Sequence, residues 1–152
     1  MAEERHGERG RARRASARAL APSDFSIQDA GKAINPIAIE GQMMGGAVQS
    51  LGIALSEGFM YDDRGPLMNA SLLDYRKLTA ADVPTIETII VEVPAPAGPF
   101  GARGVGEPPI VPAPAALSNA IEHATGVRLT ELPLTPERIA LALNPQQRTG
   151  HA

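Results

Sequence analysis

The sequence predicts a small α+β domain that combines three helices with one strand and a β-hairpin. A segment with helical spacing of apolar residues follows Asn35-Pro36, a pair that is typical of a helix start. Residues 86–93 alternate between apolar and polar side chains, as strands do. A long Gly/Pro-rich loop then precedes two more helical segments. At 152 residues the chain forms one domain at most.

The composition indicates a core that is completed by something outside the chain. Hydrophobic residues make up 43% of the sequence, but aromatic residues make up only 3%. Alanine, glycine and proline are abundant and each buries little area, whereas self-sufficient cores carry more large side chains. We therefore expect the isolated chain to be partly unfolded or prone to aggregation, because it exposes an apolar surface.

Charge and residue content exclude several functions. Arginines concentrate in residues 1–24, which we interpret as a disordered Arg/Ala-rich tail, and the remainder is acidic. We expect no nucleic-acid partner, although a basic nucleic-acid-binding arm at the N-terminus is an open alternative. The chain has no cysteine and only three scattered histidines, so we expect no metal ligands and no iron–sulfur cluster in it. No apolar run approaches the ~20 residues of a membrane span, and we expect a cytoplasmic protein without a membrane partner.

The predicted ordered domain covers residues 25–144 and is followed by a flexible tail at 145–152. Its first helix, IAIEGQMMGGAVQSLGIALSEG, has one apolar face formed by Ile37, Met44, Val48, Leu51 and Leu55. The opposite stripe consists of Gln42, Gly45, Gly46, Gln49 and Ser56. Each of four glycines in this helix costs about 1 kcal/mol relative to alanine. Such a cost indicates a close approach to the backbone, made either by another helix or by a ligand that touches Gln42.

The remaining elements follow from local signals. Residues 59–75 are predicted to form a β-hairpin that turns at residues 63–65. Beyond the Gly/Pro-rich loop, residues 111–126 are predicted to form a helix. The last helix should begin with Thr135 as its cap and Pro136 in its first turn.

The stretch GPFGARGVGEPP holds a single carboxylate, Glu107, between glycines and a proline pair. Three glycines let the backbone take positive φ and approach a ligand closely: Gly101, Gly104 and Gly106. The proline pair predicts a helix start, which would place Glu107 at a loop-to-helix junction where the helix dipole favours its charged form. Glu107 is therefore either an ordinary helix-starting acid or a catalytic base on a loop that admits a ligand.

These elements resemble, in this order, the C-terminal part of the molybdopterin-binding subunit of the xanthine dehydrogenase/aldehyde oxidase family, the molybdenum hydroxylases. The matching stretches are DAGKAINP, EGQMMGGAVQSLGIAL, NASLLDY, ADVPTIE, GARGVGEPP and the alanine-rich helix with SNAI. They extend from about Asp29 to Leu143, and the most specific part is GVGEP combined with the Gly- and Gln-containing helix. The resemblance implies the C-terminal portion of a molybdenum-cofactor-binding domain.

The resemblance also implies roles for individual residues. Glu107 would be the base at the molybdenum centre of an oxidoreductase that oxidises an aldehyde or N-heteroaromatic substrate with water-derived oxygen. Gln42, preceded by Gly41, would bind the pterin of the cofactor. The loop beside the cofactor would consist of Arg103, Gly104, Val105 and Gly106. Members of the family often have lysine where this chain has Arg103, and many have glycine at Ser50.

A complete subunit of this family is several times longer, so the resemblance implies partners. The molybdenum–molybdopterin cofactor would be shared with the remaining part of the molybdenum subunit, and iron–sulfur clusters and FAD would lie only on partner chains. The chain would then be a split component or fragment of the enzyme, inactive without the other parts. The alternatives are a non-catalytic interaction module and a truncated remnant that keeps part of the fold.

Overall fold

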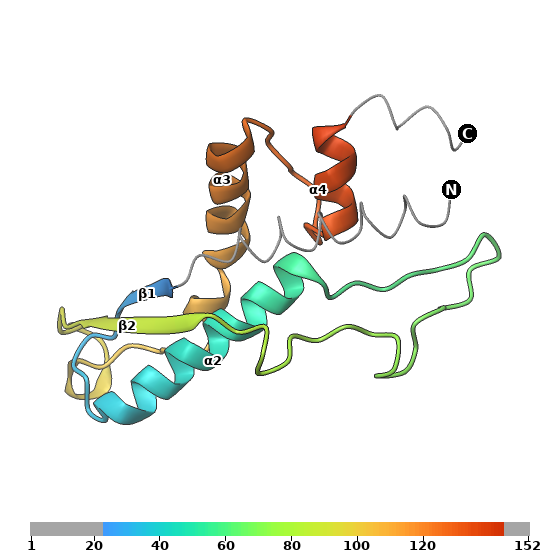
Figure 1. Ribbon diagram of the computed structural model, residues 1–152. Helices are drawn as coiled ribbons and strands as arrows, with labels where there is room; N and C mark the ends of the chain where they lie inside the picture. Colours follow the sequence, from blue (N-terminus) through green and yellow to red (C-terminus); the bar gives the residue numbers. More distant parts are fainter. Residues whose placement is uncertain (1–22, 145–152) are drawn as a thin grey trace.

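A computed structural model describes residues 23–144, so residues 1–22 of the expected N-terminal tail and the expected C-terminal tail at 145–152 lie outside the described residues. The fold mixes helices and strands, as the sequence predicts. In chain order its elements are β1 (Ser23–Asp29), α2 (Pro36–Leu55), β2 (Thr85–Val91), the short 3-10 helices η1 (Pro99–Gly101) and η2 (Pro108–Ile110), α3 (Ala113–Thr125) and α4 (Pro136–Leu143). Figure 1 shows α2 running beside the two strands, with α3 and α4 at the other end of the molecule.

The two strands form a parallel sheet that the sequence analysis did not predict. β1 begins at Ser23, two residues before the expected start of the domain, and it pairs with β2 from Ser23↔Thr85 to Asp29↔Val91. The connection between them contains α2, as parallel pairing requires. Because the strands are parallel, the segments that follow Asp29 and Val91 leave the sheet at the same end. This end carries the candidate site.

One face of the sheet lies open. On the inner face, Ile86 and Ile90 pack against buried residues. On the other face, here called the outer sheet face, four apolar side chains are 40–63% exposed: Phe25, Ile27, Ile89 and Val91. Parallel sheets are normally covered on both faces. The outer sheet face is therefore one example of the exposed apolar surface that the composition predicts.

Helix α2 begins as expected, but it buries a different face. The side chain of Asn35 caps it by accepting a hydrogen bond from the Ala38 backbone N–H at 3.2 Å. Leu51 and Leu55 are buried, whereas Ile37 is 81% exposed and Met44 is 40% exposed, so the predicted apolar face is wrong in its first half. The residues actually buried in α2 include small ones: Ile39, Met43, Gly46, Ala47, Ser50, Leu51, Gly52, Ala54 and Leu55.

The larger core lies where α2, α3 and α4 meet. Its buried members are Leu51, Ala54, Leu55, Ala113, Leu117, Ile121, Leu134 and Ile139. Helix α3 ends at Gly126, which adopts φ 75°, a left-handed conformation that favours glycine. Helix α4 begins as predicted, because the Thr135 side chain accepts a hydrogen bond from the Arg138 backbone N–H at 3.2 Å. This core fixes α3 against α2 and so fixes η2, which precedes α3.

Residues 59–75 turn back on themselves but do not form the predicted ladder of strands. A single antiparallel bridge joins Tyr61 and Leu67. Buried Asn69 ties the base of this turn by accepting from the Met60 N–H at 2.9 Å and donating to the Gly58 carbonyl at 2.7 Å. These side-chain bonds add to the two backbone bonds across the turn, from the Met68 N–H to the Met60 carbonyl at 2.7 Å and from the Asp62 N–H to the Pro66 carbonyl at 3.1 Å. Within residues 23–144, no helix has the length and apolar character that crossing a membrane requires.

Candidate functional site

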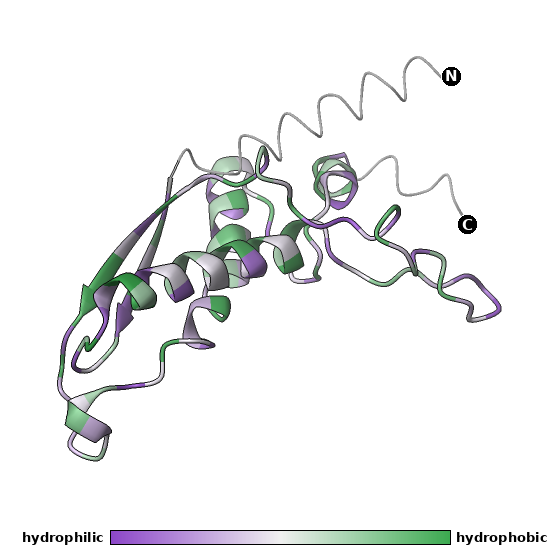
Figure 2. Cartoon of the chain, turned by 90° about the horizontal axis from the view of Figure 1, so that it is seen from below, coloured by the Kyte–Doolittle hydropathy of each residue, from purple (hydrophilic) through white to green (hydrophobic). Residues whose placement is uncertain are grey.

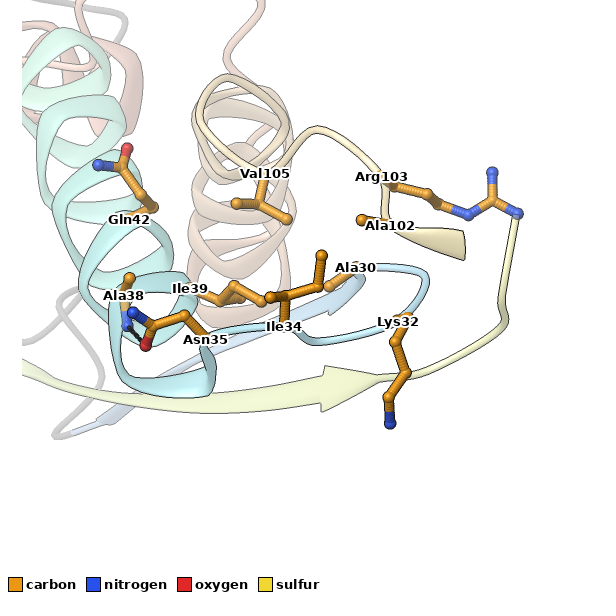
Figure 3. A pocket seen from close by; sticks show the side chains of 10 residues that line it. All are labelled: Ala30, Lys32, Ile34, Asn35, Ala38, Ile39, Gln42, Ala102, Arg103 and Val105. Atoms are coloured by element: carbon orange, nitrogen blue, oxygen red, sulfur yellow. Dashed lines mark hydrogen bonds between the residues drawn. The ribbon is translucent and has the colours of Figure 1, made fainter. Parts of the chain in front are cut away.

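A pocket of about 210 Å³ lies between the segment after β1, the first turns of α2 and the Gly/Pro-rich loop. Its lining residues are Ala30, Lys32, Ile34, Asn35, Ala38, Ile39, Gln42, Ala102, Arg103 and Val105. Figure 3 shows Gln42 on α2 and Val105 on the loop near the pocket, with the guanidinium of Arg103 pointing away from it. The pocket thus brings together three of the residues that the sequence analysis selected: Gln42, Arg103 and Val105.

Asp29, the last residue of β1, organises this end of the sheet. Its Oδ1 accepts hydrogen bonds from the backbone N–H groups of Gly31 at 2.9 Å and Val93 at 3.1 Å. Its Oδ2 forms an ion pair with the Nε of Arg103 at 3.1 Å. The Gly31 N–H has the largest effect and lowers the pKa of Asp29. Burial opposes it with the next largest effect, and the Val93 N–H and the Arg103 charge lower the pKa further. One carboxylate therefore connects three segments that are distant in sequence.

Backbone contacts fasten the Gly/Pro-rich loop to the segment after β1. The Arg103 N–H donates to the Ala30 carbonyl at 2.9 Å, and the Lys32 N–H donates to the Gly101 carbonyl at 2.7 Å. Gly31 must be glycine on two grounds, since its φ is 64° and a Cβ there would meet the Gly101 carbonyl and Arg103. Hydrophobic packing adds to these contacts, because Val105 packs against buried Ala30, Ile39 and Met43.

Beyond Arg103 the loop leaves its backbone donors free. The N–H groups of Gly101, Ala102 and Arg103 all donate to carbonyls of this chain. The next four N–H groups, those of residues 104–107, have no hydrogen-bond acceptor within residues 23–144. Residues 104, 106 and 107 are exposed, so these donors face solvent and do not need a partner within the chain. Four successive free donors beside a pocket are therefore available to acceptor atoms of a ligand or of another part of a protein.

The glycines of this loop differ from one another in backbone geometry. Gly101 has φ 81°, whereas Gly104 and Gly106 do not adopt the positive φ that glycine permits. No neighbouring atom of the described residues lies within 4 Å of a Cβ placed on Gly104, and a Cβ on Gly106 would lie 3.7 Å from the Gln42 Oε1. Neither strain nor internal crowding therefore explains these two glycines, which keep one side of the loop open.

Gln42 lies beside Gly106 with an exposed side chain that has no hydrogen-bond partner among the described residues. Its amide can both donate and accept. The preceding Gly41 is also exposed and has open space where a side chain would be. This stretch of α2 thus presents bare backbone and one free amide to whatever faces the loop.

Glu107 is exposed, and its carboxylate has no hydrogen bond or ion pair within residues 23–144. The predicted helix start is wrong in detail, because the proline pair begins only η2 and α3 starts at Ala113. The backbone after Glu107 is nonetheless fixed. Pro109 is buried against Gly46 of α2, and the Ser50 hydroxyl donates to the Ile110 carbonyl. Glu107 therefore projects a free carboxylate from a backbone that is anchored on both sides.

Two residues of this site, Gln28 and Asp29, were absent from the predicted set. Gln28 Nε2 makes a long contact of 3.4 Å with the Gly104 carbonyl, and its Oε1 is buried without a hydrogen-bond partner. Figure 2 shows that the carboxyl end of β1 is hydrophilic while that of β2 is hydrophobic. The sequence signal that could have identified these two site residues is their position as adjacent polar residues at the end of a strand. That signal becomes informative only once β1 and its parallel pairing with β2 are known.

The described residues contain no group of three or more His, Asp or Glu side chains that could hold a metal ion. The Gln42 amide can donate and accept hydrogen bonds, the free N–H groups can donate them, and a carboxylate such as that of Glu107 can accept them.

Comparison with known proteins indicates which family this chain resembles. Residues 25–84 match the molybdopterin cofactor-binding domain family. The chain is 42% identical over 116 residues to the xanthine dehydrogenase molybdenum-binding subunit of Escherichia coli O157:H7, an alignment that covers 76% of this chain and 15% of that protein. The chain corresponds to part of the molybdenum-binding subunit of the molybdenum hydroxylase family. It is also 40% identical over 121 residues to the nicotine 6-hydroxylase large subunit of Paenarthrobacter nicotinovorans, covering 78% of this chain and 15% of that subunit.

Solved structures give the same result. Quinoline 2-oxidoreductase from Pseudomonas putida 86 superposes with a TM-score of 0.72 at 40% identity, over 78% of this chain and 16% of that one. Aldehyde oxidoreductase from Desulfovibrio gigas superposes with a TM-score of 0.70 at 39% identity, over 78% of this chain and 13% of that one. The chain thus spans about 15% of the length of the molybdenum hydroxylase relatives that it matches.

Proposed function

We propose that this chain supplies one wall of a molybdenum-cofactor site, where Gln42 binds the pterin and Glu107 is the base for hydroxylation of an aldehyde or N-heteroaromatic substrate. The observation that carries this proposal is the run of four free backbone N–H groups at residues 104–107, beside the free amide of Gln42. When bound, the cofactor would supply redox chemistry that side chains cannot perform.

The residues fit the organic part of this cofactor. A pterin ring has hydrogen-bond donors and acceptors on its edge, and an amide such as that of Gln42 can accept from the donors and donate to the acceptors. Free N–H groups suit acceptor atoms of the cofactor, and the missing side chains of Gly104 and Gly106 leave room for a close approach. The pocket of about 210 Å³ is smaller than ordinary ligand pockets of roughly 300–1,000 Å³. This chain therefore forms only one side of the site.

The proposed partners follow from what this chain lacks. The remaining part of the molybdenum subunit would supply the other walls of the site and most of the substrate pocket. Iron–sulfur clusters would lie on partner chains, because a chain without cysteine cannot ligate them in the usual way. FAD would likewise be bound by a partner. We place this enzyme component in the cytoplasm.

Glu107 is suited to act as a general base. A base must reach the proton that it removes, and the exposed Glu107 carboxylate has no partner within residues 23–144 that would hold it back. Its backbone is held by Val105 upstream and by Pro109 downstream. A base on a fixed backbone loses little orientational freedom during the reaction, which favours turnover.

The test is to purify the tagged chain from its own host and to measure molybdenum and companion chains in the eluate. In a complex that contains both, Glu107→Gln should abolish turnover while the molybdenum content stays unchanged. Gln42→Ala should reduce molybdenum content. Its matched control is Gln49→Ala, an exposed glutamine two turns further along the same helix that does not line the pocket.

Each outcome has a definite meaning. If Glu107→Gln loses molybdenum together with activity, Glu107 has a structural role and is not the base. If the variant retains turnover, the proposed chemistry is wrong. A purified chain without molybdenum or a companion chain would favour the remnant over the enzyme component.

A further inference from the structure

We propose that Asp29 is a positioning residue that acts through Arg103 to hold residues 104–107 in place. This inference rests on the proposed function of Glu107, because the position of that loop matters only if the loop carries a functional group. The sequence resemblance assigns Arg103 to the loop beside the cofactor, but Figure 3 shows its guanidinium directed away from the pocket. Its partner in the structure is Asp29.

The contacts of Asp29 show that this carboxylate is itself fixed. Its Oδ1 is held by the backbone N–H groups of Gly31 and Val93, at 2.9 and 3.1 Å. These two donors belong to the segments that leave β1 and β2, so the carboxylate is tied to the end of the sheet. Its Oδ2 remains directed at the Arg103 Nε at 3.1 Å. The guanidinium thus meets an acceptor that cannot easily follow it if the loop moves.

The loop needs such an anchor because it has few internal contacts of its own. The N–H groups of residues 104–107 donate to no acceptor within the described residues. Downstream, buried Pro109 and the Ser50 hydroxyl bond hold the chain. Upstream, the Arg103 backbone bond to Ala30 and the Asp29 ion pair are the polar contacts, with Gln28 adding a weak one to Gly104 at 3.4 Å. Glu107 lies between these two sets of anchors.

A neighbouring ion pair provides a matched control. Lys32 and Glu92 form a pair at 2.9 Å, and the Glu92 carboxylate also accepts from the Ala33 N–H at 3.0 Å. This pair joins the same two strand ends, is also exposed, and forms no hydrogen bond or ion pair with residues 103–107 through its charged groups. Glu92→Gln therefore removes the same kind of interaction without removing a polar contact of residues 103–107.

The first experiment measures loop opening independently of activity. Trypsin is applied to the purified chain with the chains that accompany it, and cleavage of the Arg103-Gly104 bond is compared by mass spectrometry with cleavage of Arg64-Gly65. Both are Arg-Gly bonds, and the second lies in an exposed turn. The Arg64 bond should be cut faster in the unmodified protein. Asp29→Asn should raise the Arg103 cleavage rate about three- to fivefold, as expected for loss of an exposed ion pair, and Glu92→Gln should leave it within twofold.

The second experiment measures turnover of the same complex. Asp29→Asn and Arg103→Gln should each lower kcat about tenfold or more, with little change in KM or molybdenum content, because a base displaced by about 1 Å can lose a hundredfold in rate. The double variant should be no worse than either single one, since both remove the same contact. Arg103→Lys keeps the charge and should retain most of the activity. Glu92→Gln should behave like the unmodified enzyme.

Two results would overturn this assignment. One is an Arg103 bond that is cut as fast as the Arg64 bond and is indifferent to Asp29→Asn. The other is faster cleavage in Asp29→Asn without any loss of kcat, which would show an anchor that does not position the reaction. If Glu107→Gln retains turnover, the proposed function fails instead, and the cleavage data still decide whether Asp29 holds the loop.

Discussion

The contact between Gly46 of α2 and Pro109 of η2 gives a sharp prediction about two adjacent glycines. A Cβ on Gly46 would lie 2.8 Å from the Pro109 Cβ, 3.4 Å from its Cγ and 3.6 Å from the Ile110 Cγ1. A Cβ on the neighbouring Gly45 would meet nothing within 4 Å. We predict that Gly45→Ala stabilises the protein and that Gly46→Ala does not.

The magnitude follows from two opposing effects. In either position alanine gains about 1 kcal/mol of helix propensity over glycine. At Gly46 the proline ring must also retreat by about 0.6 Å, from 2.8 Å to the ordinary contact limit near 3.4 Å. The ring is rigid and buried, so overpacking costs about 1–3 kcal/mol. The free energies of unfolding of the two variants should therefore differ by about 1–3 kcal/mol, with Gly45→Ala the more stable.

The assay is thermal unfolding of matched preparations, followed by circular dichroism of the helical signal. The melting temperatures of the two variants should be several degrees apart. Gly46→Ala should also lower turnover of the complete complex, because Pro109 lies two residues after Glu107, whereas Gly45→Ala should not. Equal stabilisation by both substitutions would refute the close packing of η2 on α2 and with it the downstream anchor of Glu107.

Other predictions concern the anchors and the exposed surface. Ser50→Ala should destabilise the fold by about 1–3 kcal/mol in urea titrations, because it leaves the Ile110 carbonyl without its buried donor; an unchanged midpoint would contradict this. The Gly31 N–H lowers the pKa of Asp29 from its ordinary 3.8, and the Ala33 N–H lowers the pKa of Glu92 from its ordinary 4.5. The stabilisation by each carboxylate is therefore present above its ordinary pKa and is lost as the pH falls through its lowered pKa. Asp29→Asn should flatten the acid limb of a stability–pH curve. Replacing Phe25 and Ile27 of the outer sheet face by serine should reduce aggregation of the isolated chain, measured by light scattering. Unchanged scattering would show that this face does not cause the aggregation.

Local signals in the sequence predicted the elements that depend on local interactions. Asn35 and Thr135 cap their helices through their own side chains, and Gly126 ends α3 in a left-handed conformation. β1 was missed because its partner β2 lies about sixty residues away and because its alternation is inverted. Phe25 and Ile27 point outward, while the polar residues between them face α2. No local pattern distinguishes that orientation from an irregular segment.

The buried face of α2 was misassigned for a related reason. A count of large apolar residues places Met44 on the buried face of α2. The helix buries Gly46 and Ser50 instead, because η2 packs closely against Gly46 and its last carbonyl accepts a hydrogen bond from the Ser50 hydroxyl. The site residues were selected mainly through family resemblance, and the structure brings Gln42 beside the loop that precedes Glu107. The contribution of Asp29 could not be inferred from sequence, since it depends on the parallel pairing that places Val93 and Arg103 around one carboxylate.

In the described residues, the groups that have an internal contact and the groups that have none lie in different places, and this distribution bears on function. Around Asp29, Ser50 and Pro109 the contacts are complete within the chain, so the backbone on both sides of Glu107 is determined internally. Within residues 23–144, the groups left open include the N–H groups of residues 104–107, the Gln42 amide and the outer sheet face. The free polar groups at the loop can bind a polar ligand, whereas the exposed apolar side chains of a parallel sheet are normally covered by protein. A described part that fixes the loop around Glu107 but covers neither surface fits the role proposed above, one wall of a larger cofactor site.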